Sequence, residues 1–167
     1  MKAIPLIKRV LKTDLLEPAL VTVPVRGATQ LELAREEQAV GSPFSSQLRA
    51  LLAEWNGLDL EVVRVYGCVE APPLRRISDE QAWVRGSDWW ERGLVVFGSS
   101  PAGFAYAQSA DGAIVQVDYK SWTEKKRLAV DLESFLVDYV FGSEAKAFGG
   151  EEWVGELRKH GLLEPET

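Results

Sequence analysis

The sequence predicts a single domain in which helices flank a run of short strands. The chain has 167 residues, the size of one ordinary domain, and that length is enough to bury a substantial apolar core. Amphipathic helical patterns lie on both sides of residues 60–118. Within that middle region, short runs of β-branched and aromatic residues are separated by turn signals, which is typical of strands joined by tight connections.

The first helix of the core is predicted from its two ends. Thr29 and Glu32 form a capping-box pattern, in which each side chain accepts a hydrogen bond from the other residue's backbone N–H. The apolar periodicity then continues to about Val40, and Gly41 supplies the left-handed residue that commonly ends a helix.

A second helix is predicted between Ser42 and Gly57. Ser42 suits the N-cap and Pro43 suits the first helical position, where a missing backbone donor has no cost. Gly57 would end the helix. One face carries the apolar residues expected to be buried, namely Phe44, Leu48, Leu51, Leu52 and Trp55.

The middle of the chain predicts a meander of strands. A short helix interrupts it, opened by a capping box at residues 78–81 and ending near Gly86. The Asp111-Gly112 pair is a strong signal for a hairpin turn. The apolar run 94–98 is expected to be a central strand, covered on both faces. The predicted strands are residues 60–66, 94–98, 104–108 and 114–118.

Two more helices are predicted after the strands. Asp131 is expected to cap the first, and Gly142 to end it. The second covers 151–160, where acidic residues in the first turn and basic residues in the last turn complement the helix dipole. Residues 1–27 are interpreted as an arm with a short edge strand near residues 20–23. Between its caps the first helix carries an apolar stripe of Leu132, Phe135, Leu136, Tyr139 and Val140.

Composition narrows the classes of function. The chain carries 19 basic and 25 acidic side chains, for a formal charge of −6, which disfavours direct binding to nucleic acid and leaves basic partners open. Cys68 is the only cysteine, and Pro5 and Lys8 interrupt the apolar N-terminal stretch, so we expect a cytoplasmic protein without a secretory signal. We expect no membrane-spanning segment either, because no apolar run approaches the required length.

Four sequence segments together resemble the SUKH superfamily, the Smi/Knr-type domain. They are ATQLELAREEQAVG with LRALLAEWNG, DWWERGLVVFG, GFAYAQSADGAIVQVD and LAVDLESFLVDYVFG, in this order over residues 28–142. The resemblance implies an α+β fold with a mixed or mainly antiparallel sheet flanked by helices. It also implies a core domain at 28–142 and a role in binding other proteins. The tail helix is expected to pack on this core, as a helical extension over residues 143–167, through Trp153 and Leu157. Bacterial members of the superfamily resemble immunity proteins that neutralise toxins.

A cluster of aromatic and acidic residues is the predicted partner-binding site. Three tryptophans lie within eight positions beside two carboxylates, and such a set offers buried area together with attraction for a basic partner. The alternative is that at least two of these rings pack into the core. The predicted site residues are Trp83, Asp88, Trp89, Trp90 and Glu91, with Glu61, Asp111 and Glu124 nearby.

The sequence favours binding over catalysis. Cys68 and His160 are the only residues of their types, and we interpret them as a small buried side chain and a cation at a helix end. We therefore expect no catalytic residues, cofactor or metal. The leading hypothesis is an immunity protein that binds a toxin, with a basic nuclease as the partner its charge suits. A housekeeping or regulatory interaction module is the first alternative, and a small enzyme or ligand-binding domain that uses the cleft beside the tryptophans is the second.

Overall fold

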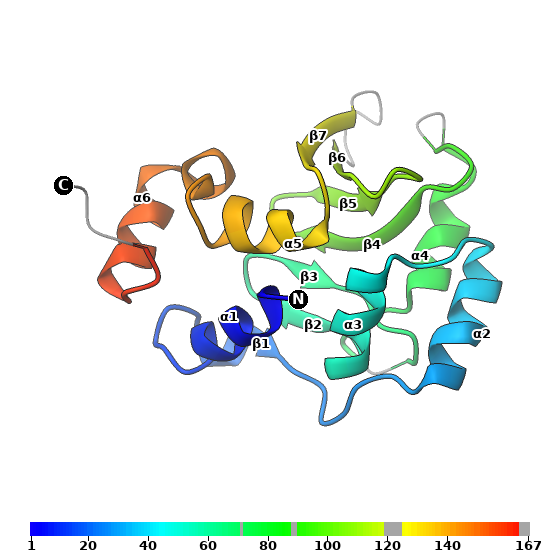
Figure 1. The fold of residues 1–167 in the computed structure, drawn as a ribbon, viewed down its shortest axis with the longest axis horizontal. Coiled ribbons are helices and arrows are strands. Elements are labelled where there is room, and N and C mark those ends of the chain that lie inside the picture. Colours follow the sequence, from blue (N-terminus) through cyan, green and yellow to red (C-terminus); the bar gives the residue numbers. More distant parts are fainter. Residues whose placement is uncertain (71, 88–89, 119–124, 164–167) are drawn as a thin grey trace.

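The computed structural model describes residues 1–70, 72–87, 90–118 and 125–163. Over these residues the chain is an α+β domain, as predicted (Figure 1). The helical elements are α1 (Ala3–Val10), η1 (Pro18–Leu20), α2 (Gln30–Val40), α3 (Ser46–Glu54), α4 (Ile77–Val84), α5 (Leu132–Ser134), η2 (Phe135–Val140) and α6 (Ala145–Lys159). The strands are β1 (Val21–Thr22), β2 (Leu58–Leu60), β3 (Arg64–Val65), β4 (Val95–Ser100), β5 (Phe104–Gln108), β6 (Ile114–Asp118) and β7 (Lys125–Ala129).

The seven strands form one antiparallel sheet in which each strand pairs with the next along the chain, in the order β1 to β7. The meander predicted from the sequence is confirmed, and β4 lies at its centre with Val95, Val96 and Phe97 buried. Short connections join β2 to β3 and link the strands from β4 to β7, whereas α2 and α3 lie between β1 and β2, and α4 lies between β3 and β4.

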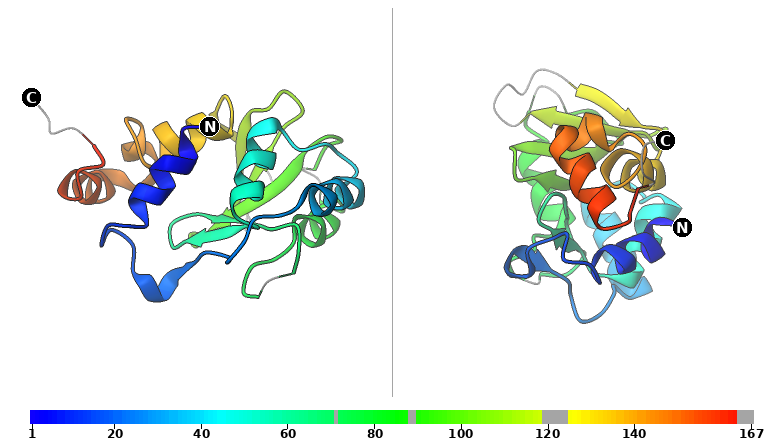
Figure 2. Two further views of the ribbon diagram at one scale, coloured as in Figure 1. Left: turned by 60° about the horizontal axis from the view of Figure 1, so that its bottom comes forward. Right: turned by 90° about the vertical axis from the view of Figure 1, so that its left-hand side faces the viewer.

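Helices cover one face of the sheet and both of its ends. α1, α3 and α5 lie in front of the sheet in Figure 1, and in the right-hand view of Figure 2, turned by 90°, the strands and α1 lie on opposite sides of the molecule. α2 and α4 pack together at one end, while α6 lies at the other. The core between the layers includes Phe135, whose ring lies 4.9 Å from that of Tyr106 and 6.3 Å from that of Phe97.

The N-terminal segment contributes to this core. In α1 the side chains of Ala3, Ile7 and Val10 are fully buried. The backbone N–H of Lys2 donates to the carboxylate of Glu133, which ties the start of α1 to α5. β1 pairs with β2 at the edge of the sheet, within the region where the sequence predicted a short edge strand.

Two helix caps occur as predicted. Thr29 and Glu32 form a complete capping box on α2, and Gly41 follows the helix in the left-handed conformation with φ of 77°. The carboxylate of Asp131 accepts the Ser134 N–H at 2.7 Å and caps α5. The predicted helix continues from α5 into η2, which is π-helical, and its apolar stripe is buried.

The predicted start of α3 is wrong. The N-cap is Ser45, whose hydroxyl accepts the Leu48 N–H at 3.1 Å, and Ser42 and Pro43 precede the helix. The helix ends at Glu54, so Gly57 does not end it. The five residues predicted to be buried are nevertheless all buried.

Three further element boundaries differ from the predictions. Residues 60–66 form parts of two strands, β2 and β3, joined by a turn at Glu61. α4 begins at Ile77 without a capping box, because the Ser78 N–H donates to the carboxylate of Glu36. The predicted tail helix is the second half of α6, which begins at Ala145 and is kinked at Gly150.

Candidate functional site

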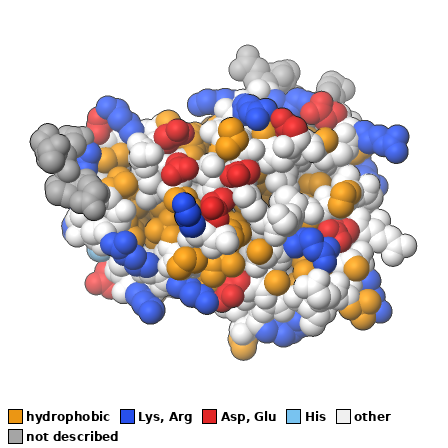
Figure 3. All heavy atoms as spheres, viewed as in Figure 1, with side chains coloured by type: hydrophobic (Ala, Val, Ile, Leu, Met, Phe, Trp, Pro, Cys, Tyr) orange, Lys and Arg blue, Asp and Glu red, His pale blue; other side chains and the backbone are white. Residues whose placement is uncertain are grey.

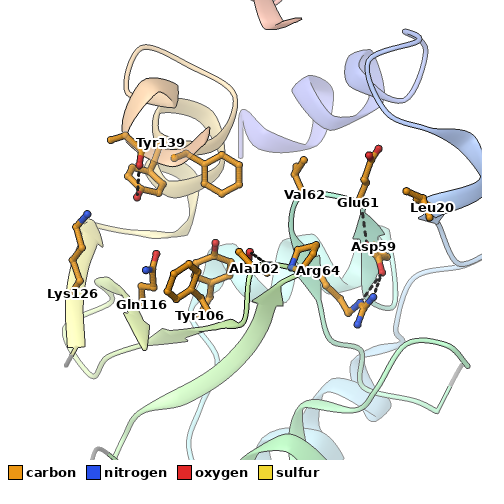
Figure 4. Close-up of a pocket in the computed structure, with 15 residues that line it drawn as sticks. Leu20, Asp59, Glu61, Val62, Arg64, Ala102, Tyr106, Gln116, Lys126 and Tyr139 are labelled. Carbon is orange, nitrogen blue, oxygen red and sulfur yellow. Dashed lines mark hydrogen bonds and ion pairs between the residues drawn. The ribbon is translucent and has the colours of Figure 1, made fainter. Parts of the chain in front are cut away.

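A groove of about 780 Å³ opens between the sheet and the helices that follow it (Figure 4). We call it the main groove. β5, β6 and β7 form its floor and one side, the β2–β3 turn forms the other side, and η2 and α6 border it above. The residues on which its chemistry depends are Glu61, Val62, Tyr106, Lys126, Tyr139 and Phe148.

The strand register places one row of this groove on a single face of the sheet. Tyr106 of β5 is paired with Gln116 of β6, and Gln116 is paired with Lys126 of β7. Residues directly opposite each other on antiparallel strands project to the same side. The row therefore changes from a buried aromatic ring to an exposed ammonium group across three strands.

The aromatic residues of the groove form a neutral, packed surface. Burial raises the pKa of Tyr106 to about 12, and burial also raises the pKa of Tyr139. The Tyr139 ring stacks on Phe135 at 5.9 Å and meets the edge of Phe148 at the same distance. Because such contacts fix the rings, the apolar surface of the groove is already formed before anything binds.

Charged groups lie at the two sides of the main groove. Glu61 and Lys126 stand on opposite sides in Figure 4. On the same side as Glu61, Asp59 and Arg64 form a tight pair in which the Arg64 Nε donates to Asp59 Oδ2 at 2.7 Å. The Asp59 carboxylate is largely buried under the guanidinium, so this pair contributes a flat polar wall with little net charge.

A second depression, of about 490 Å³, lies around Trp83 on α4. We call it the tryptophan hollow. Trp83 is 59% exposed, an unusual state for so large an apolar side chain. Arg75 lies beside it and pairs with the buried carboxylate of Glu80 at 3.2 Å. The hollow shares Arg64 and Ser100 with the main groove, so the two depressions are neighbours along one surface.

The structure separates the predicted site residues. Glu61 lines the main groove and Trp83 lines the tryptophan hollow. Trp90 is partly buried and packs against the core, which fits the alternative given for this ring. Glu91 lies in neither depression and pairs with Lys125 at 3.0 Å. Three predicted residues, namely Asp88, Trp89 and Glu124, lie outside the described residues.

Asp111 belongs to the β5–β6 turn. Its carboxylate accepts hydrogen bonds from the Ser109 hydroxyl, the Ala113 N–H and Arg127, and these partners lower its pKa to about 2. The hairpin predicted from Asp111-Gly112 is thereby explained, since the side chain organises the turn itself. The residue lines neither the main groove nor the tryptophan hollow.

The single cysteine and the single histidine of the chain both lie outside the two depressions. Cys68 is buried, and desolvation raises the pKa of its thiol to about 12, so it is a poor nucleophile at neutral pH. His160 follows the end of α6, with its Nε2 3.6 Å from a carboxylate oxygen of Glu156. Within the part of the chain that the structure describes, no three His, Cys, Asp or Glu side chains gather as a metal site.

Sequence reasoning missed most of the groove. Tyr139 was predicted only as part of a buried stripe, and Lys126 and Phe148 were not singled out. Alternation along 104–108 gives the face of Tyr106 relative to its neighbours, but only the register across three strands shows that it shares a face with Lys126.

The front face of the molecule is chemically mixed. Hydrophobic side chains gather there over the region of α1 and α5, surrounded by acidic and basic groups (Figure 3).

Among the described residues, no helix has both the length and the apolar character needed to cross a membrane.

These features define an α+β domain with a groove between its sheet and the helices that follow the sheet. The model of the SMI1 / KNR4 family (SUKH-1) matches residues 27–138, more than half of the chain. The chain therefore belongs to the SMI1 / KNR4 (SUKH-1) family, which confirms the resemblance drawn from the sequence. Comparison with curated proteins gives no match.

Proposed function

We propose that this chain acts by binding another protein, and that it is an immunity protein that neutralises a toxin by direct contact. Family membership supports the protein-binding part of this proposal. The observation on which it chiefly depends is the exposed Trp83 beside a preformed groove. Exposed aromatic side chains at the border of a groove are the kind of residue that dominates the binding energy of protein interfaces.

The charge of the chain fits a basic partner. A formal charge of −6 attracts a cationic protein such as a nuclease and accelerates its approach. The other predicted site residues, Asp88, Trp89, Trp90, Glu91, Asp111 and Glu124, remain proposed contributors of acidic and aromatic contacts. Of these, Trp90, Glu91 and Asp111 line neither depression. We place the encounter in the cytoplasm, since a single buried cysteine suits a reducing compartment.

The chemistry of the groove supports binding over catalysis. Among its described lining residues, those with a shifted pKa are Tyr106 and Tyr139, and burial raises both. Catalytic clefts usually bring together acids and bases whose pKa values are moved toward neutral pH. The main groove instead offers an apolar surface between separated charges.

The test is co-purification with the toxin-like protein encoded beside this gene, together with survival of cells that express both proteins. We expect wild-type protein to bind and protect. Trp83→Ala should weaken binding by about tenfold or more. Leu31→Ala is the matched control, because Leu31 is an exposed apolar residue on α2 that lines neither depression.

The immunity proposal fails if the wild-type chain neither binds the neighbouring toxin at low salt nor protects the cells. Binding to a protein without toxic activity would instead identify the housekeeping or regulatory module named as the first alternative. Equal binding by Trp83→Ala and Leu31→Ala would remove the tryptophan hollow from the interface.

A further inference from the structure

We infer that the main groove accommodates an extended segment of the partner protein, with an acidic residue near Lys126, a large apolar residue at the groove centre and a basic residue near Glu61. This inference rests on the proposed protein-binding function and specifies the chemistry of its ligand. The supporting observations are the separation of charges across the groove, its neutral centre, and its continuation toward Trp83.

The two charges at the sides of the groove are available to a ligand. Lys126 is exposed, and no ion-pair partner for it exists among residues 1–70, 72–87, 90–118 and 125–163. Glu61 uses one carboxylate oxygen, Oε2, to accept the Glu17 N–H at 2.7 Å. Within the same described ranges its other oxygen has no donor. Arg64 is committed to Asp59, so with respect to the described residues the uncompensated charges of opposite sign at this groove are those of Lys126 and Glu61.

The centre of the groove requires an apolar group. Tyr106 and Tyr139 are neutral, and Val62 and Phe148 are partly exposed beside them. Burying a charge against this surface without a partner is strongly unfavourable, whereas burying an aromatic or aliphatic side chain there is favourable. A ligand with its charges at the ends and an apolar middle therefore fits best.

The shape of the surface favours a polypeptide segment over a small zwitterion. The main groove of about 780 Å³ and the tryptophan hollow of about 490 Å³ share Arg64 and Ser100. A chain that crosses the main groove past Arg64 reaches Trp83, while a small molecule held between Lys126 and Glu61 does not. The segment model therefore uses both depressions in a single contact.

The experiment is selection from a phage-displayed library of random short peptides against the purified full-length chain, followed by affinity measurement with synthetic copies. Wild type should enrich peptides with an aromatic or aliphatic residue between one acidic and one basic residue. Lys126→Glu should replace the acidic position by a basic one. It should also weaken the original peptides by about three- to tenfold, as expected for reversing an exposed ion pair.

Two further variants complete the test. Glu61→Gln keeps an acceptor for the Glu17 N–H and removes the charge, so it should abolish the preference for a basic residue. Lys12→Glu makes the same change in net charge as Lys126→Glu at an exposed residue outside both depressions. Selection against this variant should enrich the same peptides as selection against the wild type. Circular dichroism and urea unfolding would establish that each variant is folded.

The inference is overturned if no peptide is enriched, or if Lys126→Glu and Lys12→Glu enrich the same sequences. It is also overturned if free tryptophan, an aromatic zwitterion, binds more tightly than the selected peptides and is unaffected by Trp83→Ala. Toxin binding that persists in Lys126→Glu and Glu61→Gln would reject the groove and leave the immunity proposal intact. If the selected peptides show the expected charge pattern but the chain does not protect cells from the toxin, the groove inference stands and the immunity proposal is rejected.

Discussion

Asn56 is joined to Val69 by hydrogen bonds in both directions. The Asn56 Oδ1 accepts the Val69 N–H at 3.2 Å, and its Nδ2 donates to the Val69 carbonyl at the same distance. The same Oδ1 also accepts the Cys68 N–H at 2.7 Å. Asn56 is buried, so this single side chain satisfies three backbone groups of the segment that follows β3. The Trp-Asn-Gly sequence after α3 thus holds two distant pieces of chain together.

We predict that Asn56→Ala lowers the free energy of unfolding by about 2–4 kcal/mol, because it leaves buried backbone groups without partners. Asn56→Asp keeps the acceptor but sets a buried carboxylate oxygen against the Val69 carbonyl, so it should be at least as destabilising near neutral pH. Urea unfolding followed by tryptophan fluorescence measures both. Equal stability of Asn56→Ala and wild type would show that the three contacts contribute nothing net.

Gly57 is predicted to be intolerant of alanine for two reasons. Its φ is 79°, and a Cβ there would lie 2.8 Å from the Gly67 nitrogen and 2.9 Å from the Val65 oxygen. Gly112 is the matched control, with φ of 89° and open space around a Cβ. Gly112→Ala should cost about 1 kcal/mol from backbone strain alone, and Gly57→Ala clearly more. Similar urea midpoints for the two variants would contradict the steric part of this argument.

Glu36 joins α2 to α4 through a buried carboxylate. It is fully buried, and it accepts hydrogen bonds from Arg76 at 2.8 Å and from the Ser78 N–H at 2.6 Å. Glu36→Ala should lower the free energy of unfolding by about 2–4 kcal/mol. This is less than the largest losses found when a buried ion pair is broken, because Arg76 is partly exposed. Glu36→Gln retains an acceptor and should lose less. The measurement is urea unfolding. If Glu36→Gln lowers the free energy of unfolding as much as Glu36→Ala does, the effect is due to the charge of the carboxylate.

We predict that the contribution of Glu32 to the free energy of unfolding is lost in acid. Hydrogen bonds from Arg26 and the Thr29 N–H lower its pKa from 4.5 to about 2. A folded-state pKa below the unfolded value means that the contribution is fully present above about pH 4.5 and is lost as the pH falls toward 2. Glu32→Gln should therefore show a shallower fall in the free energy of unfolding across this window than wild type. Parallel pH profiles of the two proteins would be the contrary result.

Cys68 is predicted to be unreactive in the folded protein. Burial raises the pKa of its thiol to about 12, and the thiolate is the form that reacts. A colorimetric disulfide reagent at mildly alkaline pH should label less than a tenth of the protein without denaturant and all of it in denaturant. Rapid stoichiometric labelling of the native chain would place the thiol at the surface.

Local signals made part of the fold predictable. The ends of α2 were predicted correctly because Thr29, Glu32 and Gly41 act on neighbours in the sequence. The β5–β6 hairpin was predictable for the same reason, since Asp111 bonds within its own turn. In each case the interactions that determine the structure span only a few residues.

Contacts between distant segments explain the errors. Two serines, Ser42 and Ser45, each suit the start of α3, and the later one is used while the Phe44 N–H donates to Glu37 of the preceding helix at 2.8 Å. At α4, Glu36 takes the N–H of Ser78 in a similar way. No local pattern reveals either contact.

The turn at Glu61 could not be predicted from the backbone conformations that glutamate prefers. Its φ is 66°, a conformation that residues other than glycine rarely adopt. Its N–H donates to Asp59 and its carboxylate accepts the Glu17 N–H, and these bonds offset the strain. The candidate site was harder still, since the main groove combines β2–β3, β5–β7 and η2, whose proximity follows only from the assembled sheet.

The opposing sides of the main groove belong to opposite edges of one continuous hydrogen-bonded sheet, near β2 and at β7. Glu61 lies in the tight turn directly after β2, so its distance from Lys126 follows mainly from the twist of the five intervening strand pairings. The width of a groove fixed in this way changes little when a complex forms. Nearly all of the conformational entropy lost on binding would therefore be lost by the incoming segment. Association should accordingly be a single concentration-dependent step, free of a slow isomerisation on the side of this chain.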